Sequence, residues 1–143
     1  MSMFVSQDDT VEYSFYCKMQ GYRITILDIE DWEKLDEEKQ QAYEKHKVVF
    51  KPLTWGAQTE CRSAGIYENP ETGFREWDGE RYVLEKLCRV VVDWDFVDED
   101  KDGEKVKVPV SREAIRHLHP AFGDHLVRVY DKKTELTEQE EKN

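Results

Sequence analysis

The sequence has no apolar run long enough to cross a bilayer, and it holds only three cysteines. A transmembrane helix needs roughly 20 apolar residues, so we expect no membrane-spanning segment. Residues 1–9 lack the basic and then apolar order of a secretory signal. The cysteines Cys17, Cys61 and Cys88 form no CxxC pair, which favours buried thiols in a reducing compartment over disulfides or zinc ligands. We therefore expect a cytoplasmic protein.

Motifs of an activated nucleophile or a phosphate-binding loop are also missing. There is no G-x-S-x-G, no cysteine in a catalytic signature and no glycine-rich loop among the seven glycines. The 32 acidic residues are so numerous that no pair of them stands out as a general acid and base. These absences predict a protein that is not an enzyme and needs no cofactor.

What the sequence has in excess is charge. Charged residues make up 37% of its 143 residues, and the net charge is −11. Acidic residues concentrate at 28–47, 93–104 and 135–143. An acidic chain repels phosphate backbones, so nucleic acid is not an expected partner. The length suits one domain, whose modest core must come largely from four Trp, seven Tyr and six Phe.

Apolar periodicity predicts strands first. Alternating residues over 10–17 and again over 22–26, with Gly21 between them, predict a β-hairpin. The composition over 29–46 changes to Glu, Lys and Gln with a thin apolar stripe, which predicts a long charged helix. Val48–Phe50 is a candidate third strand.

The second half of the chain shows mainly helical periods. Helices are expected at 54–65, 78–94, 111–118 and 120–130, with Thr54 and Ser111 as the N-caps of the first and the third. A loop of turn-forming residues is expected at 67–77. The run Val90-Val91-Val92 favours a strand locally, but the period on either side favours helix. The predicted fold class is α+β, an N-terminal β-hairpin with about five helices and a mainly helical C-terminal half. A single domain at 1–130 and a disordered acidic tail at 131–143 complete this expectation.

Metal-binding motifs are incomplete. Asp98–Gly103 matches the D-x-D-x-D-G half of an EF-hand loop, but the twelfth position is Pro109 instead of the bidentate Glu. His117 and His119 are two residues apart, so on a helix they point in different directions. We expect a solvated acidic turn and no metal site.

Aromatic residues are the candidates for contact with another protein. Most of the four Trp should lie in the core, whereas an exposed one would be a binding hot spot. The helix expected at 78–94 also has a second apolar surface, which a partner would cover unless the helix is buried on all sides. The candidate partner-binding residues are Tyr82, Val90, Trp94 and Trp55.

The order of features from Trp55 to Tyr130 carries a family resemblance. A helix that ends at Val92-Asp93-Trp94 is followed by the acidic turn 98–104. The segment Val108-Pro109-Val110-Ser111 then precedes a helix with Ser111 as its N-cap. This pattern resembles the tail assembly chaperones of siphophages. The resemblance implies a protein that binds the tape-measure protein, keeps its hydrophobic helices soluble and recruits tail-tube subunits.

Two other functions fit the same residues. One is a different phage structural part, such as a head-completion or tail-terminator subunit. The other is an acidic inhibitor of a host nucleic-acid-binding protein, in which the negative segments mimic phosphates. The sequence also leaves a homo-oligomer open.

Overall fold

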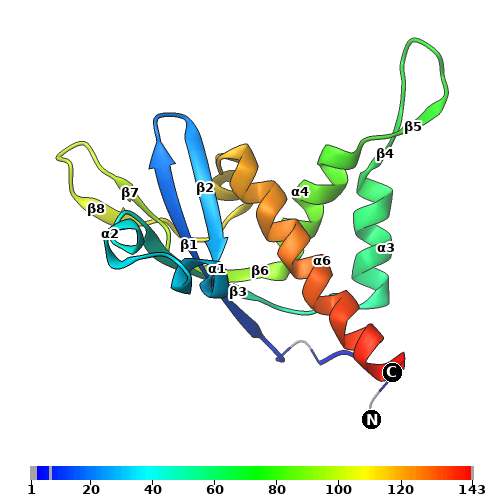
Figure 1. Cartoon of the computed structure of the whole chain (residues 1–143). Helices are drawn as coiled ribbons and strands as arrows, with labels where there is room; N and C mark the ends of the chain where they lie inside the picture. The colour runs from blue at the N-terminus through cyan, green and yellow to red at the C-terminus, as the bar shows by residue number, and fades with distance from the viewer. Residues whose placement is uncertain (1–2, 7, 143) are drawn as a thin grey trace. The chain divides into compact units, whose positions relative to one another are not determined.

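The computed structural model describes residues 3–6 and 8–142, with side chains described up to 133. Over these residues the chain forms six helices and eight strands, and the strands make three antiparallel sheets (Figure 1). The predicted class, one hairpin with about five helices, is therefore wrong. Strands at the N-terminus and a helical C-terminus fit it roughly, but further strands lie between 66 and 107.

The chain divides into two compact units, each built from separate stretches of sequence. The sheet unit comprises Thr10–Phe50 and Val91–Val110, and the helical unit comprises Met1–Asp9, Lys51–Val90 and Ser111–Asn143. A compact unit need not fold alone, so the single domain over 1–130 stays a prediction.

A four-stranded antiparallel sheet forms most of the sheet unit. Its strands, in the spatial order β2-β1-β3-β6, are β1 Val11–Gln20, β2 Arg23–Asp28, β3 Glu44–Phe50 and β6 Val91–Trp94. The N-terminal hairpin is confirmed as β1–β2, and β3 is confirmed but begins earlier than predicted. Gly21 turns the hairpin with φ of 64°, as the first residue of a two-residue loop between paired Gln20 and Arg23.

The core of the sheet unit follows the alternation that the sequence shows. Tyr13, Phe15 and Cys17 are buried on one face of β1. Phe96 stacks on Trp94 with ring centroids 5.0 Å apart and meets Phe15 edge to face at 6.3 Å. These contacts place large aromatic rings at the centre of the unit.

The long helix predicted over 29–46 does not form. The structure has α1 Ile29–Glu33, α2 Glu37–Gln40 and then β3. Asp36 interrupts the helix because its side chain accepts a hydrogen bond from the N–H of Lys39 and caps α2. The Trp32 ring folds back and stacks on Tyr16, with centroids 4.0 Å apart. One continuous helix would have buried little, because its apolar stripe was thin.

Four helices and a small hairpin make up the helical unit. They are α3 Trp55–Ala64, α4 Gly79–Val90, α5 Arg112–Arg116 and α6 Pro120–Lys142, with β4 Ile66–Glu68 and β5 Arg75–Trp77 between α3 and α4. Thr54 and Ser111 cap α3 and α5 through their hydroxyl groups, as their sequence positions predict. The buried side chains here are Cys61, Leu87, Val90, Ile115, Leu126, Tyr130 and Lys86.

The prediction of a helix through Trp94 is wrong, because α4 ends at Val90. The following residues pair with β3, with Phe50 opposite Val91 and Val48 opposite Trp94. At the junction the Lys51 N–H donates to the Val90 carbonyl at 2.8 Å. The β-branched run therefore followed its local preference, because β3 offered hydrogen-bond partners that periodicity alone could not reveal.

The last helix is longer than predicted. Helix α6 continues past Tyr130 to Lys142, and Asp131 forms an ion pair with Lys86 of α4. The side chains from 134 onward lie outside the described residues, so the expected disorder of the acidic tail stays a prediction. No helix in the described part of the chain combines the length and apolar character needed to span a membrane.

Candidate protein-binding site

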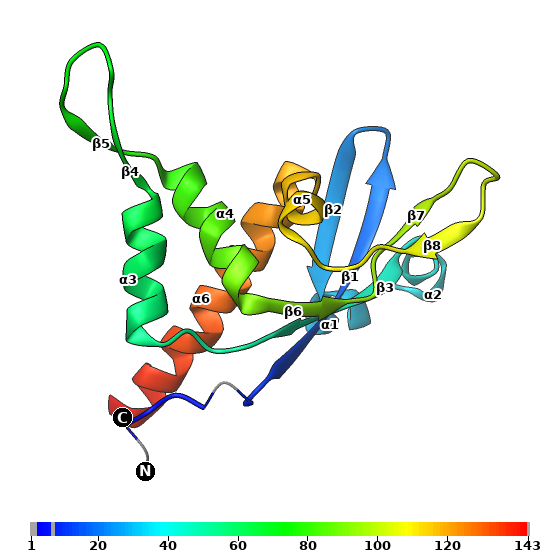
Figure 2. The ribbon, with the colours of Figure 1, turned by 180° about the vertical axis from the view of Figure 1, so that it is seen from behind.

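A short hairpin in the helical unit has three exposed large apolar side chains, Ile66, Phe74 and Trp77. Strands β4 and β5 pair antiparallel, with Ile66 opposite Trp77 and Glu68 opposite Arg75. We call this segment, Ile66–Trp77, the 66–77 hairpin. Figures 1 and 2 show it extending beyond the ends of α3 and α4.

The loop of the 66–77 hairpin is ordered by its own hydrogen bonds. The Asn69 side-chain oxygen accepts from the Glu71 N–H at 2.9 Å, and the Asn69 carbonyl accepts from the Gly73 N–H at 2.7 Å. The Asn69 N–H in turn donates to the Phe74 carbonyl at 2.9 Å. Gly73 has φ of 73°, which a residue with a Cβ adopts only at a cost. The turn-forming residues predicted as a loop therefore close a hairpin.

The base of the 66–77 hairpin is anchored by Trp77. A Cβ on Gly65 would lie 2.7 Å from the Trp77 ring, so the indole packs directly on that glycine. The Trp77 ring also contacts Tyr82, with centroids 5.2 Å apart. Tyr82 is fixed in its turn, because its hydroxyl accepts hydrogen bonds from Gln58 and Lys86.

Polar contacts fix the flank of the hairpin. The Glu76 carboxylate accepts hydrogen bonds from the Tyr67 hydroxyl at 2.7 Å and from the Asn69 amide at 3.2 Å. The hydrogen bond to Glu76 raises the pKa of Tyr67 above its usual value, because it stabilises the protonated phenol. The Arg81 guanidinium lies 5.2 Å from the Tyr67 ring centre. Contacts within the helical unit therefore fix both the strands and the loop of the 66–77 hairpin.

Three apolar side chains remain exposed on this ordered hairpin. Phe74 is 72% exposed, and Ile66 and Trp77 are each about half exposed. Single exposed apolar residues are ordinary, but several on one short element indicate a contact surface. Acidic residues Glu68, Glu71 and Glu76 surround them with only Arg75 in opposition, so the hairpin is net negative.

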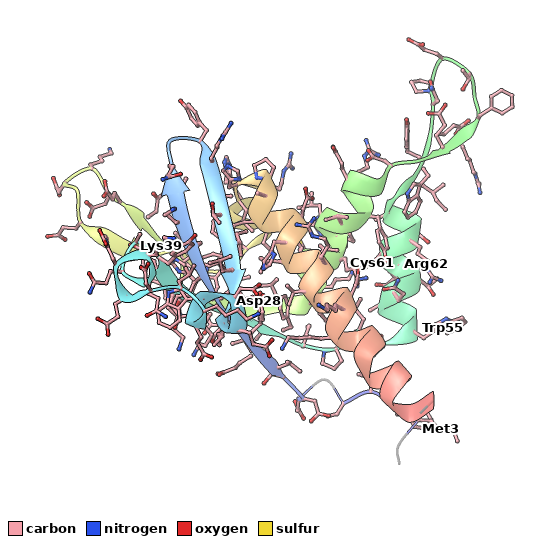
Figure 3. All side chains as sticks on the ribbon, in the orientation of Figure 1. Met3, Asp28, Lys39, Trp55, Cys61 and Arg62 are labelled. Atoms are coloured by element: carbon pink, nitrogen blue, oxygen red, sulfur yellow. The ribbon has the colours of Figure 1, made fainter. Side chains whose placement is uncertain are left out.

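The four residues predicted for partner binding lie in two different units and differ in exposure. Val90 and Trp94 are fully buried, in the helical and the sheet unit respectively, and Trp94 donates its indole N–H to the Val108 carbonyl. Those two residues are therefore core, which corrects their assignment to a partner surface. Tyr82 is half-buried beneath Trp77. Trp55 is 84% exposed at the first residue of α3, where Figure 3 shows its side chain pointing away from the ribbon.

Phe74 and Ile66 are the residues that the sequence prediction missed. A signal for Phe74 existed, since it is an aromatic residue among turn formers, where no helix or strand period offers it a buried position. Ile66 gave no such signal, because one apolar residue after Gly65 fits a core position equally well.

The acidic motif forms the turn of the third sheet. It connects β7 Val97–Glu99 to β8 Lys105–Lys107, and Gly103 has φ of 78°. The Asp100 carboxylate accepts hydrogen bonds from the N–H groups of Asp102 and Glu104, both at 2.9 Å. Its carboxylate therefore closes a turn. Among the described residues no group of three or more His, Cys, Asp or Glu has the arrangement of a metal site.

Burial raises the pKa of all three thiols. Burial, followed by the nearby carboxylates of Glu44 and Asp95, raises the pKa of Cys17 to about 11. Burial is also the largest cause that raises the pKa values of Cys61 and Cys88. A reactive cysteine needs the opposite shift. His46 lies within hydrogen-bonding distance of Asp95, at 3.2 Å. None of the three thiols has the lowered pKa of a cysteine that works with such a His–Asp pair.

Comparisons of the chain with protein-family models, with curated proteins and with solved structures found no match.

Proposed function

We propose that this chain is a protein-binding factor that catalyses no reaction of its own, and that the 66–77 hairpin is its contact surface. The observation that carries the proposal is the exposure of Phe74, Ile66 and Trp77 on a hairpin whose backbone is already ordered. Pre-ordering matters because a rigid loop loses little conformational entropy when it binds.

The exposed area on the hairpin is sufficient for a binding hot spot. Complete burial of a large apolar side chain is worth roughly 1.5–3 kcal/mol. Phe74 has most of its surface still available, and Ile66 and Trp77 about half. Together they offer about 3–5 kcal/mol of gross stabilisation, which is typical of the central residues of a protein interface.

The narrower form of the proposal is the role that the sequence resemblance implies, a phage tail assembly chaperone. Its client would be a tape-measure protein, whose long helices are apolar, and its second partner a tail-tube subunit. An aromatic hairpin surrounded by carboxylates suits this task, because the apolar side chains contact the client while the charges keep the complex soluble.

Co-expression tests both the general proposal of a protein-binding factor and the narrower proposal of a tail assembly chaperone. The tape-measure protein encoded in the same genome is produced alone, with the parent chain, and with Phe74→Asp. We expect it to be soluble only with the parent chain, because a buried unpaired carboxylate opposes an apolar contact. Val97→Asp is the matched control, since Val97 is a half-exposed apolar residue on another two-stranded hairpin.

The outcomes separate the alternatives. Equal solubilisation by Phe74→Asp and the parent chain would place the contact elsewhere, with Trp55→Asp as the next variant to test. An insoluble tape-measure protein in every case would refute the chaperone form. Mass spectrometry that finds the chain in purified virions would favour a structural subunit instead. Binding to a nucleic-acid-binding protein that falls steeply with salt would favour the acidic inhibitor.

A further inference from the structure

Within residues 3–6 and 8–142, strand β2 is an edge strand that pairs only with β1 of the four-stranded sheet. Its sequence from Arg23 to Asp28 contains no proline, and its register with β1 is unbroken. Proteins usually protect such an edge with a lysine in the middle of the strand, a proline or a bulge. None of these protections occurs in β2, where Ile24, Thr25, Ile26 and Leu27 form the interior.

The hairpin turn determines which N–H and C=O groups of β2 do not form hydrogen bonds with β1. In a two-residue hairpin the flanking residues, here Gln20 and Arg23, exchange both of their main-chain hydrogen bonds. The alternation then directs the N–H and C=O of Thr25 and Leu27 toward β1. The corresponding groups of Ile24, Ile26 and Asp28 point toward the free edge.

We propose that this edge pairs with β2 of a second copy of the chain, antiparallel, about a two-fold axis at Thr25. A two-fold axis through an antiparallel ladder must pass between a residue and its own copy. Centring it on Thr25 places Ile24 opposite Ile26 of the other copy, and Ile26 opposite Ile24. Both residues direct their hydrogen-bonding groups outward, so these two pairs form four main-chain hydrogen bonds.

Side chains and charge fit a second copy in this register. Each Ile24 meets an Ile26 on one face, and branched apolar pairs across strands are stabilising. The only charged residues of β2 are Arg23 and Asp28, so the strand is neutral in a chain of net charge −11. Arg23 faces Leu27 of the other copy and Asp28 faces Tyr22, so no like charges oppose each other. The pairing lies in the sheet unit and is independent of the 66–77 hairpin.

Thr25 gives a test that is specific for the register. At a non-hydrogen-bonded pair the two Cα atoms lie about 4.5 Å apart, within the range that a disulfide spans. We expect Thr25→Cys to give a disulfide-linked dimer under mild oxidation, in a full-length Cys88→Ser background that removes the half-exposed native thiol. Arg23→Cys is the matched control, because in this register Arg23 of one copy and Arg23 of the other are four residues apart along the ladder.

Sedimentation velocity over a concentration series measures the association itself. The parent chain should show a monomer–dimer equilibrium, and Thr25→Lys should raise its Kd at least about fivefold because two ammonium groups then face each other. Thr25→Ser should leave the Kd unchanged. A parent chain that remains monomeric up to about millimolar concentration would overturn the proposal. Cross-linking of Arg23→Cys as fast as Thr25→Cys would also overturn it.

Discussion

The ion pair between Lys86 and Asp131 allows a quantitative test of what holds α6 against α4. The Lys86 side chain is buried, and its Nζ lies 2.5 Å from Asp131 Oδ1 and 3.3 Å from the Tyr82 hydroxyl. The rings of Tyr82 and Tyr130 lie 5.4 and 5.6 Å from the same ammonium group. The Asp131 side chain, in contrast, is 40% exposed. The two partners therefore differ in what their removal leaves behind.

Asp131→Asn is expected to destabilise the chain more than Lys86→Met. Removing one partner of a buried pair costs about 3–5 kcal/mol when the remaining charge has no compensation. The remaining ammonium of Lys86 keeps one hydroxyl and two aromatic rings, which lowers the expected cost of Asp131→Asn to about 2 kcal/mol. After Lys86→Met the carboxylate of Asp131 is solvated, so the expected cost is below about 1 kcal/mol.

Urea unfolding followed by circular dichroism measures the difference. With a typical urea dependence of about 2 kcal/mol per molar, Asp131→Asn should lower the midpoint by about 1 M. The double variant should resemble Lys86→Met, because Asp131 matters only through the charge it neutralises. Equal costs for the two single variants, or a greater cost for Lys86→Met, would refute this account of the pair.

The same pair predicts a pH dependence. Burial by itself lowers the pKa of Lys86, but hydrogen bonds and attraction to Asp131 outweigh burial and raise the pKa above its usual 10.5. Stability from a raised pKa is complete below the unfolded value and is lost as the pH rises through the folded value. The difference in unfolding free energy between the parent chain and Asp131→Asn should therefore be constant at neutral pH. As the pH is raised, it should begin to change above about pH 10.5.

Four shorter predictions follow from other contacts. Gly65→Ala should cost about 1–3 kcal/mol and change the near-ultraviolet circular dichroism of Trp77, because its Cβ would overlap the indole. Glu85→Gln should destabilise at pH 7, and by less as the pH falls below the usual pKa of 4.5. Burial raises the pKa of Glu85, but the guanidinium groups of Arg112 and Arg89 lower it by more, and stability from a lowered pKa is lost as the pH falls through the folded value. Calorimetry should detect no Ca²⁺ site tighter than about millimolar, and Asp100→Ala should loosen its turn without changing that result. Deletion of residues 134–143 should leave the melting temperature unchanged, and a fall of several degrees would show that the tail docks.

The sequence predicts best where the periodicity and the local residue types agree. The β1–β2 hairpin was recovered because strict alternation and Gly21 point to the same structure. The N-caps Thr54 and Ser111 were recovered because a cap needs only a hydroxyl group and the next three residues. Local information is sufficient for such features.

The errors arise where a distant partner decides the structure. The helix expected over 78–94 was shortened because β3, some forty positions earlier, offered Val91–Trp94 a strand to pair with. The helix expected over 29–46 gives way to a strand from Glu44 because β1 offers that segment a partner, and Trp32 stacks on Tyr16 of the same strand. The candidate site failed for a related reason: the surface apolar residues Phe74 and Ile66 can be distinguished from the buried Val90 only after the neighbours of each are known.

The order in which the sheet strands occur along the chain affects how the protein is made. Strands β1, β2 and β3 leave the ribosome together and can pair at once, whereas β6 follows only after all of 51–90 has been synthesised. At about 5–20 residues per second this delay lasts several seconds, during which β3 has an open edge. The nascent chain therefore presents two unpaired strand edges, β2 and β3, at its most aggregation-prone stage. A translational pause between residues 50 and 91 would prolong that stage, and rapid translation of this segment would shorten it.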